Sequence, residues 1–239
     1  LTIDLTPVLK PWAGDLHGMI ARRVIRVLTV NSKTFYFHDK GTQRGTVVDW
    51  FKLFEDELNK KLVAEKTLTN KHLKVRLVFI PVRRDQLLPG LAAGQGDIAA
   101  ANLTVTPERQ KLVDFTVSGL ANVSEVAVSG PASPNIVSLD SLSGKEVFVR
   151  KSSSYYESLV AVNKKFATEK KLPITLKEAP ETLEDEDLLE MLNAGLVALI
   201  IVDKHKADFW KQIFPKLMVH DNVAVRAGGE VAWAIRKDS

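Results

Sequence analysis

Short apolar runs, separated by polar turns and helical repeats, follow one another along the chain. Most runs are rich in branched aliphatic side chains or alanine, which is typical of strands in a sheet that is largely buried. The runs that predict strands are residues 25–30, 73–80, 98–101, 122–130, 146–149, 174–178, 197–202, 219–225 and 230–235. Because helical repeats connect many of these strands, the pattern predicts an α/β fold, each sheet mixed but mainly parallel and flanked by helices.

Amphipathic repeats predict the connecting helices. Residues 47–63 carry apolar side chains at helical spacing. The residues expected on the buried face of this helix are Trp50, Leu53, Phe54 and Leu58. Asp85 is expected to cap the next helix, which Gly94 and Gly96 end. Further helices are predicted over residues 155–169, 186–192 and 204–210, an irregular lead-in over 1–15 and a loop over 34–45.

The series of strands and helices occurs twice. A glycine- and proline-rich break at 130–134 follows the first series, and the chain returns after the second. Two αβ lobes joined by two crossing hinge strands explain this order. We predict lobe 1 at residues 1–122 plus 223–239 and lobe 2 at residues 123–222, with a ligand cleft between them. Ligands of open α/β sheets bind beyond the carboxyl ends of strands, so polar turns at those ends are candidate sites.

Composition narrows the function classes. The 239-residue chain has a formal net charge of +4 and no cysteine, which excludes disulfides and thiolate chemistry. No basic stripe with interleaved aromatic residues predicts nucleic-acid binding, and acidic runs such as Glu184–Asp187 alternate with basic ones. The five histidines show no paired metal spacing, so no metal and no cofactor are predicted. The apolar run 194–202 is too short to cross a bilayer, and the absence of a signal peptide at Leu1 predicts a mature or trimmed chain.

A polar turn with one arginine follows the predicted strand 98–101. Asn102 and Thr104 offer polar groups there, and Arg109 follows in a first helical turn. A guanidinium holds a carboxylate through two parallel hydrogen bonds, so one arginine at a strand end can orient an anionic ligand. The alternative is a surface arginine that pairs with a neighbouring acid.

This stretch resembles a known family. Its motifs are Leu-Leu-Pro-x-Leu-x-x-Gly-x-x-Asp-Ile, Asn-Leu-Thr-Val-Thr-x-Glu-Arg and Val-Asp-Phe-Thr, and they are similar to those of extracellular solute-binding proteins of the polar amino-acid type. Residues 22–29, 148–157 and 231–239 resemble the N-terminal, non-catalytic module of membrane-bound lytic transglycosylase F. The resemblance covers nearly the whole chain from about Arg22. It implies a two-lobed periplasmic-binding-protein type 2 fold.

The resemblance also implies roles for individual residues. Arg109 matches the position that grips a ligand α-carboxylate, and Asn102 and Thr104 match positions that present backbone and hydroxyl groups. Ser153 and Ser154 match a turn that contacts the carboxylate from the second lobe, although Ser152 replaces its usual glycine. Asp203 matches the position that pairs with a ligand ammonium. Each role has a structural alternative. Asn102 and Thr104 can form hydrogen bonds with the local backbone, Ser153 or Ser154 can simply cap a helix, and Asp203 can cap the helix that follows it.

Three further residues bear on the ligand. Phe35 and Tyr36 are candidates for stacking on it, although aromatic side chains after a strand are more often core residues. Arg84 stands where amino-acid receptors of this type usually place a second aromatic residue. The change removes half of an aromatic clamp and adds a charge. It favours a ligand with an additional acid group, such as a peptidoglycan stem peptide.

The function expected from the resemblance is ligand binding without catalysis. We expect a monomeric periplasmic module, associated with the outer membrane in a longer form, that closes at a hinge around an amino acid or stem peptide. In that setting it regulates an attached C-terminal transglycosylase domain. The alternative is a free-standing amino-acid receptor that delivers its ligand to the permease of an ABC importer.

Overall fold

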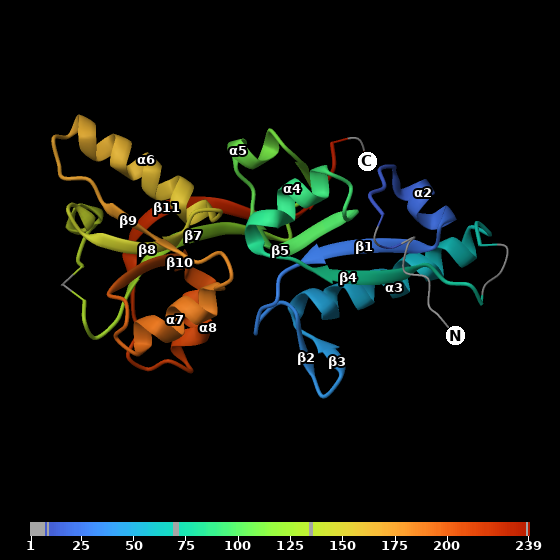
Figure 1. Cartoon of the computed structure of the whole chain (residues 1–239), viewed down its shortest axis with the longest axis horizontal. Helices are drawn as coiled ribbons and strands as arrows, with labels where there is room; N and C mark the ends of the chain where they lie inside the picture. Colours follow the sequence, from blue (N-terminus) through green and yellow to red (C-terminus); the bar gives the residue numbers. More distant parts are fainter. Residues whose placement is uncertain (1–7, 9, 69–71, 134–135, 238) are drawn as a thin grey trace. The chain divides into compact units, whose positions relative to one another are not determined.

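The computed structural model describes residues 8, 10–68, 72–133, 136–237 and 239 (Figure 1). The chain forms two compact units. Unit 1 contains Leu1–Ser118 and Ala232–Ser239, and unit 2 contains Gly119–Val231. The chain therefore passes between the units twice. The lobe boundaries expected at residues 122 and 222 stay a prediction, and part of the expected lead-in, residues 1–7 and 9, lies outside the described residues.

Unit 1 is built on a sheet whose central strands are parallel. The strands are β1 (Val24–Thr29), β4 (Arg76–Pro81), β5 (Ile98–Thr104), the two-residue β6 (Asp114–Phe115) and the last residues of β11 (Met218–Ile235). β1 lies between β4 and β5, and both neighbours run parallel to it. In Figure 1, α3 (Thr46–Ala64) lies on one side of β1 and β4, and α2 (Leu16–Ala21) and α4 (Leu87–Ala92) lie on the other. These layers confirm the predicted α/β class for this unit.

The loop expected over residues 34–45 is wrong in part, because it contains a hairpin. β2 (Phe37–Asp39) pairs antiparallel with β3 (Thr42–Arg44). Lys40 and Gly41 join the two strands with φ values of 48° and 79°. Two left-handed residues in succession make the turn that best matches the twist of a hairpin, so this short exposed ribbon forms without a hydrophobic repeat.

The buried face of α3 also differs from the expectation. Trp50 and Leu53 are 64% and 60% exposed. The buried apolar side chains of the helix are those of Val47, Val48, Phe51, Leu58 and Leu62. The sheet-facing stripe is centred on Phe51, about 100° around the helix from Trp50. Leu58 belongs to the buried face as predicted, and Phe54 is half-buried beside it.

Asp85 does not cap α4. It lies inside a short 3-10 turn, Arg84–Gln86, and its carboxylate accepts two hydrogen bonds from Arg83, at 2.7 and 3.1 Å. Gln86 precedes the helix without a capping side-chain bond. The predicted end of the helix is confirmed at Gly94, which has a φ of 70°. A side chain there would also meet the Trp12 carbonyl at 2.7 Å, so glycine is required on two counts.

Unit 2 is a mixed sheet covered by helices. Its strands are β7 (Leu120–Ser129), β8 (Glu146–Arg150), β9 (Thr175–Ala179), β10 (Leu199–Asp203) and most of β11. β8 pairs parallel with β9 and β10, whereas β7 pairs antiparallel with β10 and β11. The helices of unit 2 are α6 (Ser154–Thr168), α7 (Asp185–Asn193) and α8 (Lys204–Lys211). The short helix α5 (Pro107–Gln110) belongs to unit 1. β11 is one long strand with register shifts, where two strands were predicted.

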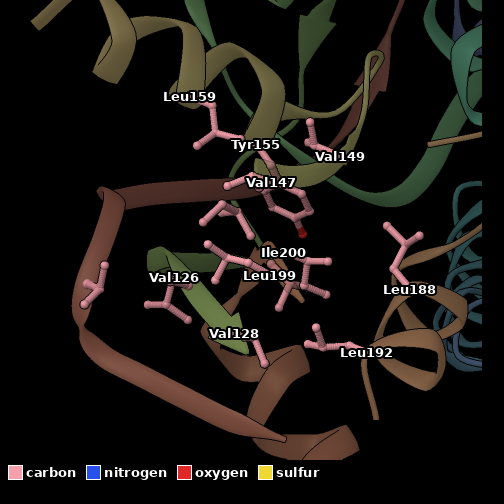
Figure 2. Close-up of a cluster of buried hydrophobic side chains, with 14 of the residues drawn as sticks. Val126, Val128, Val147, Val149, Tyr155, Leu159, Leu188, Leu192, Leu199 and Ile200 are labelled. Atoms are coloured by element: carbon pink, nitrogen blue, oxygen red, sulfur yellow. The ribbon is translucent and has the colours of Figure 1, made fainter. Parts of the chain in front are cut away.

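The core of unit 2 lies between its sheet and its helices. Figure 2 shows strand side chains from Val126, Val147 and Ile200 meeting helix side chains such as Leu159 and Leu188. All five are at most 3% exposed. In Figure 1, α6 lies on one side of these strands and the α7–α8 pair on the other, which is the layering expected for an α/β unit. This packing fixes the ends of the strands, from which the polar turns begin.

Candidate functional site

The predicted residues of unit 1 gather at one edge of its sheet. Because β1, β4 and β5 are parallel, their carboxyl ends lie at the same edge. The turn containing Phe35 follows β1, Arg84 follows β4, and Thr104 ends β5. The sequence order alone separates these residues widely, and the parallel pairing is what gives them a common edge.

Arg109 is anchored at this edge. Thr106 caps α5, since its hydroxyl accepts a hydrogen bond from the Arg109 backbone nitrogen at 3.2 Å. The guanidinium then turns back and donates from Nη1 to the Thr104 carbonyl at 3.0 Å. Glu108, the acid next to Arg109 in the sequence, pairs with Lys111 at 2.6 Å. The guanidinium is half-buried and is oriented by its own turn.

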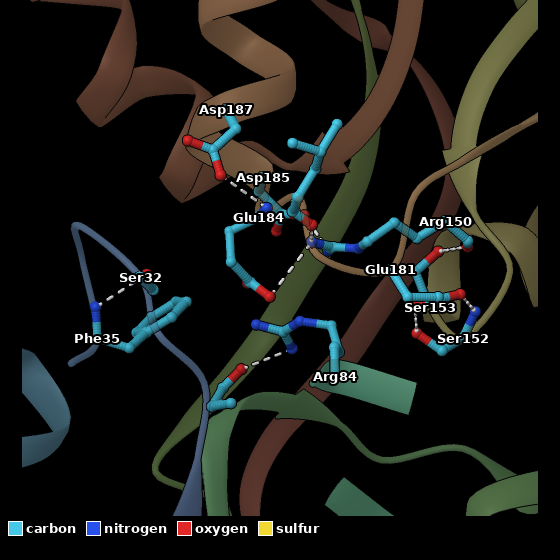
Figure 3. Close-up of polar contacts among 12 residues, drawn as sticks. Ser32, Phe35, Arg84, Arg150, Ser152, Ser153, Glu181, Glu184, Asp185 and Asp187 are labelled. Atoms are coloured by element: carbon cyan, nitrogen blue, oxygen red, sulfur yellow. Dashed lines mark hydrogen bonds and ion pairs between the residues drawn. The ribbon is translucent and has the colours of Figure 1, made fainter. Parts of the chain in front are cut away.

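Two other residues shape the same end of β5. Arg84 is half-buried and donates from Nη1 to the Ala101 carbonyl at 3.0 Å (Figure 3). Asn102 has a φ of 52° inside the strand, a left-handed conformation that asparagine tolerates better than most residues. Thr104 is 3% exposed. β5 thus runs three residues past the predicted strand and includes both polar residues that were expected in a turn.

Phe35 and Tyr36 are core residues of unit 1. They are 6% and 2% exposed. The Ser32 hydroxyl accepts a hydrogen bond from the Phe35 backbone at 3.1 Å, which fixes the turn (Figure 3). The Tyr36 ring lies 5.6 Å from that of Phe79, and its hydroxyl accepts a bond from Gln43 at 3.0 Å. The stacking role expected for these residues stays a prediction, and their burial matches the core alternative.

The predicted residues of unit 2 also share a sheet edge. β8, β9 and β10 are parallel to one another, so Arg150, Ala179 and Asp203 end their strands at the same side. The turn with the three serines follows β8, and Asp203 is the last residue of β10. This edge is where an α/β sheet places its ligands.

The serine turn is closed by its own hydrogen bonds. Ser153 caps α6: its hydroxyl accepts from the Tyr156 backbone at 3.2 Å and donates to the Arg150 carbonyl at 2.7 Å. Both Ser153 and Ser154 are 4% exposed. Ser152 donates from its backbone nitrogen to Glu181 at 3.0 Å, and its hydroxyl donates to the same carboxylate (Figure 3). The helix-cap alternative is thus confirmed for Ser153, while the ligand role of the turn stays a prediction.

Asp203 lies in a buried group of charged side chains. It is 1% exposed, and its Oδ2 atom is 3.0 Å from the ammonium of Lys206. The same ammonium is 2.7 Å from Oδ2 of Asp185 and 3.1 Å from the Tyr155 hydroxyl. Burial, and next to it Asp185, raises the pKa of Tyr155 well above its usual range, so the phenol stays protonated and donates to Asp185 at 3.0 Å.

Arg150 completes this group from the end of β8. It is 2% exposed and forms ion pairs with Asp185 and, at 3.5 Å, with Glu184 (Figure 3). Glu184 and Asp185 are themselves 3% exposed. Glu184 and Asp185, at the N-terminus of α7, thus meet buried cations.

A further buried carboxyl lies beside the group. Glu125 of β7 is directly opposite Asp203 of β10 in the antiparallel ladder and is 1% exposed. The Ser158 hydroxyl donates to it. Burial raises the pKa of Glu125, and the hydrogen bonds from Ser158 and Ser154 only partly oppose that rise. Two carboxyl groups thus face each other across the ladder, and one of them has a raised pKa.

Sequence reasoning missed Arg150, Asp185, Lys206 and Glu125. A weak signal existed for Lys206, since it lies three residues after Asp203 in a predicted helix, where side chains at that spacing meet. No local pattern marks the other three. Over the part of the chain that the structure describes, no three histidine or acidic side chains are grouped to hold a metal ion. In those same residues, no helix has the length and apolar character needed to cross a bilayer.

Known proteins resemble this chain at the level of sequence. A family model for bacterial extracellular solute-binding proteins, family 3, matches residues 25–213. The membrane-bound lytic murein transglycosylase F of Ectopseudomonas mendocina is 29% identical over 212 residues, which are 88% of this chain and 39% of that protein. Its counterpart in Stutzerimonas stutzeri is 28% identical over 225 residues, 94% and 42% of the two chains. The chain therefore spans less than half the length of these relatives.

Solved structures resemble it as well. An ancestral arginine-binding protein bound to arginine is 25% identical, with a TM-score of 0.64 over 90% of this chain and 85% of that one. A putative L-cystine ABC transporter from Listeria monocytogenes has a TM-score of 0.70 over 90% and 84% of the two chains. It is 21% identical and bears on the fold alone. These likenesses confirm the fold class that the sequence predicted.

Proposed function

Since the chain belongs to family 3 of the bacterial extracellular solute-binding proteins, we propose that it binds a small ligand with a carboxylate, which Arg109 holds. The observation that carries this proposal is the anchoring of the Arg109 guanidinium at the carboxyl edge of unit 1. A guanidinium in a fixed plane is suited to a carboxylate, which it binds through two parallel bonds. The left-handed Asn102 beside it supports the same assignment, since backbone strain of this kind is common at functional sites.

We propose an amino-acid-like or peptide-like ligand, with the murein stem peptide as the preferred class. The ancestral protein bound to arginine supports a ligand built from amino acids. The names of the relatives, which are murein transglycosylases, support a murein peptide. Arg84 at the same edge supports a ligand with a second acid group. The serine turn after β8 is a second candidate for carboxylate recognition, through the α6 N-terminus.

The module is proposed to regulate rather than to catalyse. Its relatives are more than twice its length, and their murein-cleaving activity is assigned here to the part that this chain does not cover. Binding in the periplasm, with closure at a hinge, would then report the supply of murein peptides to that domain. Such control requires different ligand affinity in two conformations of the module. The rival function is delivery of an amino acid to an ABC importer.

A thermal-shift screen tests the binding. The probes are free amino acids and murein stem peptides, each measured on the wild type and on Arg109→Ala. A ligand at a hundredfold its Kd adds about 2.7 kcal/mol, which raises the Tm of a chain of this size by roughly 5 to 10 °C. Stem peptides should produce this shift in the wild type and not in the variant.

Arg76→Ala is the matched control. Arg76 is an arginine at the opposite end of β4, and its side chain is 66% exposed. This variant should keep the full ligand shift. A shift with free amino acids alone would favour the importer function. If no probe shifts the wild type, or if Arg109→Ala responds like the wild type, the proposal fails.

A further inference from the structure

The outer edge of the unit 1 sheet is closed by its own helix. Asn59 of α3 holds the residue before β4, since its amide bonds both the nitrogen and the carbonyl of Val75 at 2.9 Å. Glu55, one turn earlier in the helix, accepts a hydrogen bond from the Leu77 backbone at 2.8 Å. β4 then ends at Pro81, which has no N–H to donate. An edge strand that is capped in this way is closed to a further strand.

Unit 2 begins its edge strand with the same contact. Asn163 of α6 accepts a hydrogen bond from the Ile174 nitrogen at 2.7 Å and donates to the Ile174 carbonyl at 2.9 Å. Ile174 immediately precedes β9, which is the outermost strand of this unit and pairs with β8. Within the described residues, no side chain caps β9 further along as Glu55 caps β4.

The outer side of β9 is therefore open at two residues. Thr175 donates from its backbone nitrogen to the Lys145 carbonyl at 2.8 Å, so its backbone groups face β8. Because this direction alternates along a strand, the backbone groups of Leu176 and Glu178 point away from β8. In the part of the chain that the structure describes, neither backbone has a hydrogen-bond partner on that side. An uncapped edge of this kind is a template for an added strand.

Charge selects the strand that fits this edge. Lys177, between the two open residues, is exposed and forms no ion pair with any described residue. Glu178 is also exposed, but the Lys151 ammonium lies 3.4 Å from its carboxylate. The charge that remains on the edge is thus positive. An opposite charge directly across a strand pair stabilises it, and a like charge destabilises it.

A second copy of the chain does not fit the same edge. Antiparallel pairing of Leu176 with Glu178 of the second copy would place the two Lys177 ammoniums opposite each other. Pairing about Leu176 would set Glu178 against Ile174, whose backbone groups are already capped. Pairing about Glu178 would oppose two carboxylates and set Leu176 against Pro180, which has no N–H. Each antiparallel register is therefore penalised.

We propose that the β9 edge binds an extended segment of another polypeptide, which adds as an antiparallel strand with an acidic side chain opposite Lys177. Leu176 and Glu178 each exchange a pair of hydrogen bonds with this segment. Main-chain bonds give strand addition its affinity, and the side chain opposite the lysine gives it selectivity. The inference goes beyond the proposed function, because it involves unit 2 alone and does not depend on Arg109.

Two blocked peptides test the edge on the whole chain. Acetyl-Thr-Lys-Glu-Val-Thr-amide places a glutamate opposite Lys177, and acetyl-Thr-Lys-Lys-Val-Thr-amide places a lysine there. Each titration is followed through the backbone amide signals of the isotope-labelled protein. The glutamate peptide should shift the signals of Leu176, Lys177 and Glu178 and slow the hydrogen exchange of the two outward amides. It should bind about fivefold more tightly than the lysine peptide.

Variants of the edge separate its backbone from its charge. Glu178→Pro removes an outward N–H and no bond to β8, so it should keep the fold and lose most of the peptide response. Glu178→Ala is the matched control, because it loses the exposed carboxylate but keeps the N–H, and it should bind the peptide like the wild type. Lys177→Glu should reverse the preference, so that the lysine peptide binds more tightly.

Several results would overturn the inference. These are no shift of the β9 signals at millimolar glutamate peptide, equal binding of the two peptides, and undiminished binding to Glu178→Pro. If that variant does not fold, the reversal expected in Lys177→Glu decides. Concentration-dependent shifts of the same signals without peptide would assign the edge to a second copy and also overturn it. Arg109→Ala should bind the glutamate peptide like the wild type, which separates this test from that of the proposed function.

Discussion

Each unit buries a group of charges, and the two groups are built in opposite ways. In unit 1, the single carboxylate of Asp97 forms ion pairs with the guanidiniums of Arg22, Arg26 and Arg236. Backbone carbonyls accept most of the other hydrogen bonds that these guanidiniums donate. In unit 2, three carboxylates, those of Asp185, Asp203 and Glu184, pair with two cations, Arg150 and Lys206. The first group stands where β5 begins, and the second where β8 and β10 end. The difference separates a structural anchor from a group at an edge suited to ligands.

The unit 1 group joins distant segments of the chain. Arg26 is fully buried and donates to Asp97, to the Gly94 carbonyl at 2.8 Å and to the Lys10 carbonyl at 2.9 Å. Arg236 donates to the Gly96 carbonyl at 2.7 Å. These bonds fasten the residues before β1 and the last strand to the start of β5. Asp97, which belongs to the family motif, is thus a structural residue here.

The largest effect is expected for Asp97→Asn. The amide keeps the shape of the side chain but removes the one negative charge that Arg22, Arg26 and Arg236 share. Leaving buried guanidiniums without it should lower the free energy of unfolding by about 3 to 5 kcal/mol, measured by urea denaturation. A loss below about 1 kcal/mol would show that the backbone carbonyls alone satisfy the arginines, and the contrast between the two groups would disappear.

The same change in unit 2 should cost less. In Asp185→Asn, Lys206 keeps Asp203, and Arg150 keeps Glu184 and the Leu183 carbonyl. We expect a loss of about 2 kcal/mol, the scale of a hydrogen bond to a charged group. Urea denaturation of both variants under one set of conditions gives the comparison. A loss of unfolding free energy equal to that of Asp97→Asn would mean that the remaining partners of Lys206 and Arg150 do not compensate for the lost carboxylate.

The smallest effect, and a pH-dependent one, is expected for Glu125→Gln. Burial raises the folded-state pKa of Glu125 above its ordinary value of 4.5. The folded protein therefore binds this proton more tightly than the unfolded chain. The resulting stabilisation is complete below pH 4.5 and is lost as the pH rises through the folded-state pKa. Glutamine is neutral throughout, so the variant should gain stability relative to the wild type across that interval.

Paired unfolding curves from pH 4 to pH 8 would measure this difference for Glu125→Gln. Glu57→Gln is the control, because Glu57 is an exposed glutamate whose side chain is 72% accessible. Its curve should run parallel to that of the wild type. A Glu125→Gln curve that is also parallel would contradict the raised pKa and would mean that the carboxyl is charged in the folded state.

The fold was largely predictable from the sequence, for reasons visible in particular elements. β5 and β10 are almost wholly buried strands, and their continuous apolar runs predict them. The buried face of α3 was not predictable from large side chains alone, since Trp50 is exposed and Val48 is buried. Local repeats define a helix, but the sheet it meets decides which of its faces is covered.

The candidate site was predictable only as a set of strand ends. Arg109 follows from its motif and from its position after β5. Lys206 had a weak local signal, because it lies three residues after Asp203. Asp185 meets Lys206 across 21 positions only once α7 and α8 have packed, so it remained hidden.

One contact in the core of unit 1 cannot form until synthesis of the chain is almost complete. Trp233 stacks on Phe51 of α3 with ring centroids 4.3 Å apart, and the backbone around it pairs with Asp114–Phe115. Residue 233 leaves the ribosome only after all of unit 2 has been made. Until then, the fully buried Phe51 lacks its aromatic cover. A nascent unit 1 thus leaves part of its apolar core uncovered for the whole time that unit 2 is translated.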